Sequence, residues 1–275
     1  MRREEGWIWL SVEYAAIVVR EILCAEARQN RKDGVKTRFH FMSYSGKPQA
    51  MCGRFFCEEI SREECSAHLG AFRLGAVSGI AASYNIAPTQ TVPIIRWQEE
   101  ENQPELAVAM WGLVPCWWRK PLGEKKFSTF NAKSEEAAGK ASFRTAWKKR
   151  PCLVPMSGYY EWKREKGTKQ PYAIALRNRR WFYVCGLWDR AFIEDAPLDS
   201  FTILTTAANQ AVREIHARMP VIPDQSTAIN WITTPLSERE KIIRSHDPAD
   251  MHVWKVGREI GNVKNQGKQL AMPTK

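Results

Sequence analysis

Short apolar runs, each long enough for one β-strand and separated by Gly, Pro or Asn, recur along most of this chain. The runs are CGRFF (52–56), TVPIIRW (91–97), ELAVAMWGL (105–113), CLVPM (152–156), GYYEWK (158–163), YAIAL (172–176), WFYVCGLW (181–188), FTILTT (201–206) and MHVWKV (251–256). Helical patterns are fewer: SREECSAHLG (61–70), AANQAVREIHA (207–217), STAINWI (226–232) and LSEREKIIRS (236–245). Because strands and helices do not alternate regularly, we predict an α+β fold, a single domain with a barrel-like, mainly antiparallel β core and peripheral helices.

One stretch carries nearly all of these patterns. Residues 51 to about 256 contain no repeat and no low-complexity break, which predicts one domain, 51–256. Before it, residues 1–50 hold an apolar run that Glu13, Arg20 and Glu21 interrupt, so neither a membrane span nor a secretory signal fits. We expect 1–50 to be a leader, either a wrongly assigned start or a segment removed after synthesis, and 257–275 to be a basic flexible tail.

The composition is basic, with 41 Lys and Arg against 30 Asp and Glu and a formal net charge of +11. Such an excess favours a polyanionic partner, either nucleic acid or an anionic membrane surface. The seven cysteines lack the regular spacing of a disulfide framework, so we expect a reducing compartment and free thiols. A zinc site of Cys52, Cys57, Cys65 and His68 is disfavoured because the spacing lacks two tight ligand pairs. We therefore expect no metal and no cofactor.

Cys52 follows Met51 directly, and this position can give it a chemistry that no internal cysteine has. If translation starts at Met51, removal of the initiator leaves a terminal cysteine with a thiol of pKa about 8.5 and an α-amine of pKa about 7.7. Such a 1,2-aminothiol condenses with an aldehyde to a Schiff base, and the thiol then adds to the same carbon to close a thiazolidine ring. The alternative is a small buried residue of a first strand.

Glu161 and His216 are the candidates for proton transfer. Strand alternation puts Tyr159 and Glu161 on one face and Tyr160 and Trp162 on the other. A carboxyl partly desolvated among aromatic rings has a raised pKa that suits proton transfer, and the alternative is a solvated carboxylate on an edge strand. His216 ends a predicted helix, where it is either a favourable cation or an acid–base or phosphate-contacting group.

Three further residues are candidates for binding. Asn131 is either a turn or cap residue, or an amide placed to bind a substrate oxygen. Trp117 and Trp118 are adjacent, so both fit the core only where the segment turns, and we expect at least one indole at the surface. Exposed indoles among basic residues provide what unstacked bases and their phosphates require.

Seven stretches, in order, resemble one family. They are MCGRF (51–55), YNIAPTQ (84–90), MWGLVPCWW (110–118), NAKSE (131–135), PCLVPMSGYYEW (151–162), GLWD (186–189) and FTILTTAANQAVREIHARMPVI (201–222). Together they strongly resemble the SOS response-associated peptidase family, also called abasic site processing proteins. The resemblance runs from Met51 to about Trp254 and implies a domain that binds single-stranded DNA and captures abasic sites.

The resemblance also implies residue roles. Mature N-terminal Cys52 would bind the ring-opened sugar aldehyde as a thiazolidine, which shields the lesion from strand cleavage. Glu161 would assist Schiff-base formation and reversal, His216 would stabilise or protonate the sugar oxygens, and Asn131 would position the lesion. The resemblance implies that the DNA phosphates are bound in a groove by Arg54, Lys133 and Arg218, with Thr205 near this groove. It also implies that the bases flanking the lesion pack against Pro88, Trp117 and Trp118. The lyase-type reactivity that the family shows through the Schiff base would use the same pocket as the formation of the thiazolidine.

The chain departs from the family in two respects. Lys133 stands where the family usually has Arg, which keeps the charge but loses the bidentate fork. With residues 1–50 attached, the nitrogen of Cys52 is an amide, which forms neither a Schiff base nor a thiazolidine. Three alternatives follow: the functional chain starts at Met51, the leader is removed, or the protein is an inert relative with a blocked cysteine.

Two other function classes stay open. A thiol peptidase, including a self-processing one, would use Cys52 with His216 and Asn131. A non-covalent binder of single-stranded DNA would need only the basic and aromatic residues. The basic composition, the thiols and the resemblance together predict a monomer of the bacterial cytoplasm or nucleoid, with DNA and no membrane as its partner.

Overall fold

The computed structural model describes residues 53–69, 73–74, 79–165 and 167–274. They belong to one compact unit, Gln49–Lys275. The expected leader and Cys52 lie outside the described residues. In the described part of the chain, no helix is both long and apolar enough to cross a membrane.

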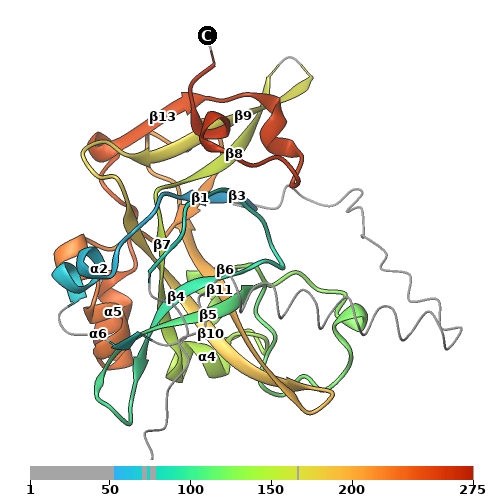
Figure 1. Ribbon diagram of the computed structural model, residues 1–275, viewed down its shortest axis with the longest axis vertical. Helices are drawn as coiled ribbons and strands as arrows, with labels where there is room; N and C mark the ends of the chain where they lie inside the picture. Colours follow the sequence, from blue (N-terminus) through green and yellow to red (C-terminus); the bar gives the residue numbers. More distant parts are fainter. Residues whose placement is uncertain (1–52, 70–72, 75–78, 166, 275) are drawn as a thin grey trace, which may run out of the picture. The chain divides into compact units, whose positions relative to one another are not determined.

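Five strands of this unit close into a barrel (Figure 1). In order around the ring they are β11 (Ala196–Ala207), β10 (Phe182–Ile193), β7 (Pro151–Met156), β4 (Thr91–Gln98) and β5 (Gln103–Trp111). Successive strands are antiparallel, and a short parallel pairing of β11 with β5 closes the ring. Fully buried side chains such as Ile94, Leu106 and Phe201 supply the main core. The predicted α+β class with a barrel-like, mainly antiparallel core is confirmed.

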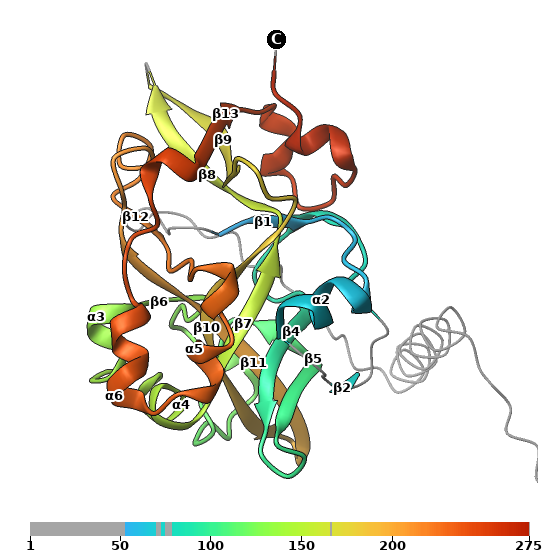
Figure 2. The same ribbon diagram turned by 90° about the vertical axis from the view of Figure 1, so that its left-hand side faces the viewer.

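A five-stranded antiparallel sheet lies beside the barrel (Figures 1 and 2). Its order is β13 (Met251–Lys255), β9 (Thr168–Leu176), β8 (Gly158–Glu165), β1 (Phe55–Cys57) and β3 (Ser83–Ile86). The chain passes from barrel to sheet where β7 continues into β8 through Ser157. Along β8, Tyr159 enters the main core while Tyr160 packs with Phe56 in a second apolar cluster, so the predicted alternation is confirmed.

Three short strands extend the barrel: β2 (Arg73–Leu74) pairs with β5, while β6 (Asn131–Lys133) and β12 (Arg218–Pro220) pair with β11. The α-helices described are α2 (Arg62–Leu69), α3 (Ser134–Ala137), α4 (Arg144–Lys149), α5 (Asn230–Thr233) and α6 (Leu236–Arg239). Short 3-10 helices are η1 (Leu122–Glu124), η2 (Gln225–Thr227), η3 (Glu240–Ile242), η4 (Pro248–Asp250), η5 (Arg258–Gly261) and η6 (Lys268–Ala271).

Helix α2 begins as its sequence predicts. The Ser61 N–H donates to Glu64 Oε2 at 2.9 Å, and the Glu64 N–H donates to Ser61 Oγ at 3.3 Å. These reciprocal bonds form the capping box and satisfy two N–H groups that the helix itself leaves without partners.

The predicted helix over 207–217 is wrong, because this segment forms turns that return the chain from β11 to β12. The Ala208 N–H donates to Ala217 O at 2.9 Å, so the two ends of the segment are adjacent. A continuous helix of this length would hold its ends about 15 Å apart. Asn209 Oδ1 accepts the N–H groups of Ala211 and Val212, which stabilises the first turn.

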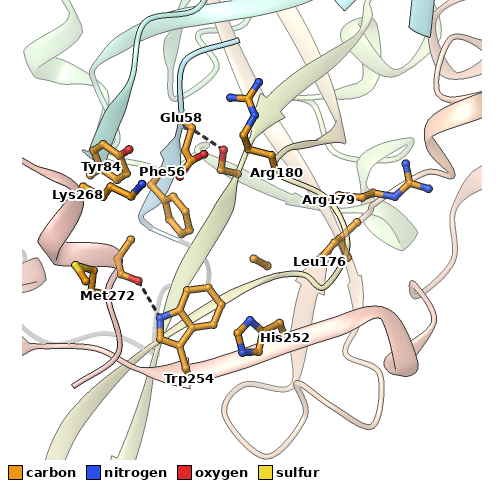
Figure 3. Close-up of a pocket in the computed structure, with 13 residues that line it drawn as sticks. Phe56, Glu58, Tyr84, Leu176, Arg179, Arg180, His252, Trp254, Lys268 and Met272 are labelled. Carbon is orange, nitrogen blue, oxygen red and sulfur yellow. Dashed lines mark hydrogen bonds between the residues drawn. The ribbon is translucent and has the colours of Figure 1, made fainter. Parts of the chain in front are cut away.

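Residues 257–274, here called the closing segment, do not form the flexible tail that their polar composition predicts. Ile260 and Leu270 are buried in the cluster of Phe56 and Tyr160, so two buried apolar residues anchor a mainly polar stretch. η5 packs on β9 and η6 on β3. The closing segment also forms one wall of a pocket of about 230 Å³ (Figure 3).

Candidate functional site

The start of β1 lies against the middle of β8. Phe55 pairs with Tyr159, and the Tyr160 N–H donates to Arg54 O at 2.9 Å. Continuing this antiparallel register by two residues from Phe55 places Glu161 opposite Gly53. The next residue toward the N-terminus is Cys52, the predicted nucleophile. Glu161 therefore lies opposite the residue to which Cys52 is attached.

Glu161 is buried, with 1% of its surface exposed. It lies on an interior strand, between β1 and β9, where it pairs with Tyr172. The alternative of a solvated edge-strand carboxylate is therefore wrong. A carboxyl shielded from water on an interior strand is suited to proton transfer with a group beside it.

The end of β11 brings three distant parts of the chain together. On one side Ile203 pairs with Asn131 and Thr205 with Lys133, and on the other Ala207 pairs with Arg218. Thr205 is fully buried, and its Oγ1 donates to Ala132 O at 3.2 Å. The fold thus brings Asn131, Lys133, Thr205 and Arg218 to one place, although up to 87 positions separate them in sequence.

Both basic residues of this group are paired with carboxylates of α3. Arg218 makes a bidentate ion pair with Glu135, with N–O distances of 2.8 and 2.7 Å. The bond from Arg218 is the main cause of the lowered pKa of Glu135. Lys133 Nζ lies 2.7 Å from Glu136 Oε1. A phosphate would therefore have to compete with these two acidic residues, whose role the sequence reasoning missed although they follow Asn131 in NAKSEE.

His216 follows the turn that replaces the predicted helix. Its Nδ1 accepts the Arg218 N–H at 3.1 Å. With Nδ1 as acceptor, the neutral imidazole carries its hydrogen on Nε2, which suits donation to a sugar oxygen. The same bond holds the imidazole next to β12.

Phe130 connects the end of β11 with the start of β1. A Cβ built on Gly53 would lie 3.9 Å from Phe130 Cε2. Phe130 O accepts from Trp111 Nε1 at 2.8 Å and from the Ile203 N–H at 3.0 Å, which fixes this segment to the barrel. Asn131 follows Phe130 directly, so the segments that hold Asn131 and Gly53 are neighbours. The candidate residues beside β11 therefore adjoin those at the start of β1.

Trp117 and Trp118 lie on a loop that turns, because the Trp118 N–H donates to Pro115 O at 2.8 Å. Trp117 is 50% exposed, which confirms that at least one indole reaches the surface. Phe127, at the other end of the loop, places its ring 5.5 Å from that of Trp118 and is also exposed. Sequence reasoning missed this third ring. Cys116 N–H, at the base of the loop, donates to buried Asp189 Oδ2 at 2.8 Å.

Pro88 occupies a tight turn closed by the Gln90 N–H and Ala87 O at 3.2 Å. The next residue, Thr89, has a φ of 76°, a region that a β-branched residue rarely adopts. Its N–H donates to Trp111 O at 2.8 Å, which holds the strained turn against the barrel. Strain of this kind costs roughly 1–3 kcal/mol and is common at functional sites.

The remaining predicted DNA contact, Arg54, is half-buried, and its Nη1 donates to Asn85 Oδ1 at 2.5 Å and Ile260 O at 2.8 Å. Its phosphate contact stays a prediction. Cys57, Cys65, Cys116, Cys152 and Cys185 are free thiols, as expected. Within the described ranges, no three His, Cys, Asp or Glu side chains gather as a metal site would require.

The pocket of Figure 3 contains none of the predicted site residues. Phe56 and Trp254 line it, and both belong to the apolar cluster of Tyr160. Strand alternation along β8 directs Glu161 to the other face of the sheet. The pocket is therefore separate from the group around Glu161.

Comparison with known proteins identifies close relatives. Residues 51–263 match the family described as SOS response associated peptidase (SRAP). The abasic site processing protein YMR114C of Saccharomyces cerevisiae is 30% identical over 200 residues, covering 70% of this chain and 53% of the relative. YedK of Escherichia coli, also an abasic site processing protein, is 31% identical over 194 residues, covering 69% of this chain and 84% of the relative. The chain thus spans about half of the yeast relative and most of the bacterial one.

Solved structures share the fold. A protein from Bacteroides thetaiotaomicron matches with a TM-score of 0.70 and 24% identity, covering 81% of this chain and 100% of its own. A protein from Bordetella bronchiseptica matches with a TM-score of 0.64 and 25% identity, covering 75% of this chain and 100% of its own.

Proposed function

The chain belongs to the SOS response associated peptidase family, and from this premise we propose that it binds single-stranded DNA and captures abasic sites covalently through Cys52. The observation that carries the proposal is the register that places buried Glu161 opposite Gly53, the neighbour of Cys52. The names of the relatives YMR114C and YedK, which describe abasic site processing, support the substrate class.

The proposed reaction begins at the aldehyde of the ring-opened sugar. The Cys52 amine adds to the aldehyde carbon and, with loss of water, forms a Schiff base. The Cys52 thiol then adds to the same carbon and gives its proton to the nitrogen, which closes the thiazolidine. Glu161 supplies and removes the protons of the dehydration step, and His216 donates to the sugar oxygens. Asn131 positions the lesion, and elimination from the Schiff base accounts for lyase-type reactivity.

This chemistry needs a free amine at Cys52. We therefore propose that residues 1–51 are absent from the active protein, whether through a later start or through removal. Lys133 and Arg218 would contact phosphates beside Thr205, with Pro88, Trp117 and Trp118 against the flanking bases. We further propose that the protein acts as a monomer in the cytoplasm, at the DNA.

Intact mass of the protein from its native host, before and after incubation with single-stranded DNA carrying one abasic site, tests the proposal. We expect a mass that starts at Cys52 and an adduct that survives denaturation. Cys52→Ala should form no adduct yet still bind the DNA, and Glu161→Gln should slow capture about 10²–10⁴-fold, the usual contribution of a general acid or base. Glu165→Gln, at a half-buried carboxylate at the far end of the same strand that pairs with Lys255, is the matched control.

A denaturation-resistant adduct with Cys52→Ala would refute the mechanism. A full-length mass without any adduct would refute covalent capture by this chain and leave the non-covalent or peptidase alternatives.

A further inference from the structure

The closing segment meets the start of β1 through a buried polar group. Asn85 is fully buried, and its Oδ1 accepts from Arg54 Nη1 at 2.5 Å. The Asn85 Nδ2 donates to Asn262 O at 2.9 Å and Asn265 O at 2.8 Å. One amide therefore connects Arg54 to two carbonyls of the closing segment, and its oxygen and both of its N–H groups have partners.

Arg54 also contacts the closing segment directly, since its Nη1 donates to Ile260 O at 2.8 Å. Burial lowers the pKa of the Arg54 guanidinium. Among the residues that the structure describes, Arg54 forms no ion pair, so amide and carbonyl oxygens meet its charge. A half-buried charge is costly to leave without such oxygens, so the carbonyls of the closing segment stabilise the Arg54 guanidinium.

Apolar contacts hold the other side of the closing segment. Ile260 and Leu270 pack in the cluster of Phe56 and Tyr160, and Trp254 Nε1 donates to Ala271 O at 2.9 Å (Figure 3). Figure 1 shows the segment, in red, beside β3, β8 and β9. The segment is thus fixed independently of Arg54 and can serve as a rigid support for it.

We propose that Arg54 and Asn85 are positioning residues for Cys52, and that the closing segment holds them. Arg54 lies two residues from Cys52, and its backbone O accepts the N–H of Tyr160, the neighbour of Glu161. Fixing Arg54 on both its side chain and its carbonyl fixes the direction in which the chain leaves β1 toward residue 52. This inference rests on the proposed function and assigns Arg54 a different principal task from a phosphate contact.

The test uses the full chain with the recognition sequence of a site-specific protease ending at position 51, so that cleavage after folding leaves Cys52 first. Two quantities are measured with single-stranded DNA carrying one abasic site. The first is the single-turnover rate of adduct formation at saturating DNA. The second, in a Cys52→Ala background, is the non-covalent affinity and its dependence on salt.

Arg54→Met and Asn85→Ala should lower the saturated rate by 10-fold or more, since a misplacement of about 1 Å can cost about 10²-fold. Non-covalent affinity should change less than twofold, with an unchanged salt slope. Arg54→Lys, which keeps the charge but reaches fewer acceptors, should give an intermediate rate. Lys264→Met removes an exposed charge of the same segment and is the matched control, expected to behave as the unsubstituted protein.

The inference would be overturned if Arg54→Met kept the rate of adduct formation at saturating DNA but bound DNA more weakly. A salt dependence of the affinity reduced by about 0.7 would then assign Arg54 to one phosphate. Failure of the unsubstituted protein to form any adduct would overturn the proposed function as well. If Asn85→Ala does not fold, the Arg54 variants alone decide. Reaction of urea-unfolded variants with formaldehyde, followed by mass, checks that each carries the free aminothiol.

Discussion

Asp189→Ala should both destabilise the fold and loosen the loop of Trp117 and Trp118. Asp189 is buried, with 1% of its surface exposed, and its carboxylate accepts from the Cys116 N–H at 2.8 Å and the Arg190 N–H at 3.0 Å. It also pairs with Arg150. The Cys116 bond ties the loop to the barrel.

The magnitude follows from these partners. Leaving the Cys116 N–H without an acceptor costs about 1–3 kcal/mol. The Arg150 side chain is 31% exposed and regains water, so loss of its ion pair adds only about 1 kcal/mol. We expect about 2–4 kcal/mol for Asp189→Ala. Asp189→Asn, which keeps one acceptor oxygen and the shape, should cost about half of that.

Urea unfolding measures the free-energy change, and titration of the Cys52→Ala variants with single-stranded DNA measures the effect on the loop. Asp250→Ala, at an exposed aspartate, is the control and should change stability by less than about 0.5 kcal/mol. If Asp189→Ala is as stable as that control, the burial argument is wrong. If it is destabilised but binds DNA with unchanged affinity, the loop does not depend on this anchor.

Three other outcomes are expected. Ser61→Ala removes the α2 cap and should lower the free energy of unfolding by about 1 kcal/mol in urea, with Ser61→Asp restoring it. Glu135→Gln releases Arg218 from its ion pair, so single-stranded DNA should bind several-fold more tightly with a steeper salt dependence, measured by fluorescence anisotropy; unchanged binding would exclude Arg218 as a contact. Burial lowers the pKa of Lys125 to about 8, so between about pH 8 and 10.4 the unfolded chain binds more protons and stability rises with pH. Lys125→Met should reduce the rise of the urea midpoint with pH in this range. An equal rise in the variant and the unsubstituted protein would contradict the lowered pKa of Lys125.

The long strands could be predicted because each carries enough apolar residues to define its own period. The short strands could not. The sequences SYNI, NAK and RMP of β3, β6 and β12 have no strand pattern, and they are extended because β1 or β11 offers them hydrogen-bond partners. The segment 207–217 shows the reverse case, since its helical period was overruled by the need to bring Ala208 and Ala217 together.

The candidate site was predictable as a set of residues but not as a set of pairs. Local sequence and resemblance indicated Arg218 and Arg54, yet neither indicates that Glu135 pairs with the first or that Asn85 and Ile260 bind the second. These partners lie 31 to 206 positions away, where only the complete topology decides which groups meet.

The bond between Arg54 and Ile260 has a consequence for the order of events during synthesis. Arg54 is made 206 residues before the carbonyl that binds it. Translation proceeds from the N-terminus, so β1 leaves the ribosome long before its last partner exists. A nascent chain therefore lacks, until residue 260 has been made, the carbonyl that binds Arg54, and a chain truncated before residue 260 would leave the Arg54 guanidinium without this partner.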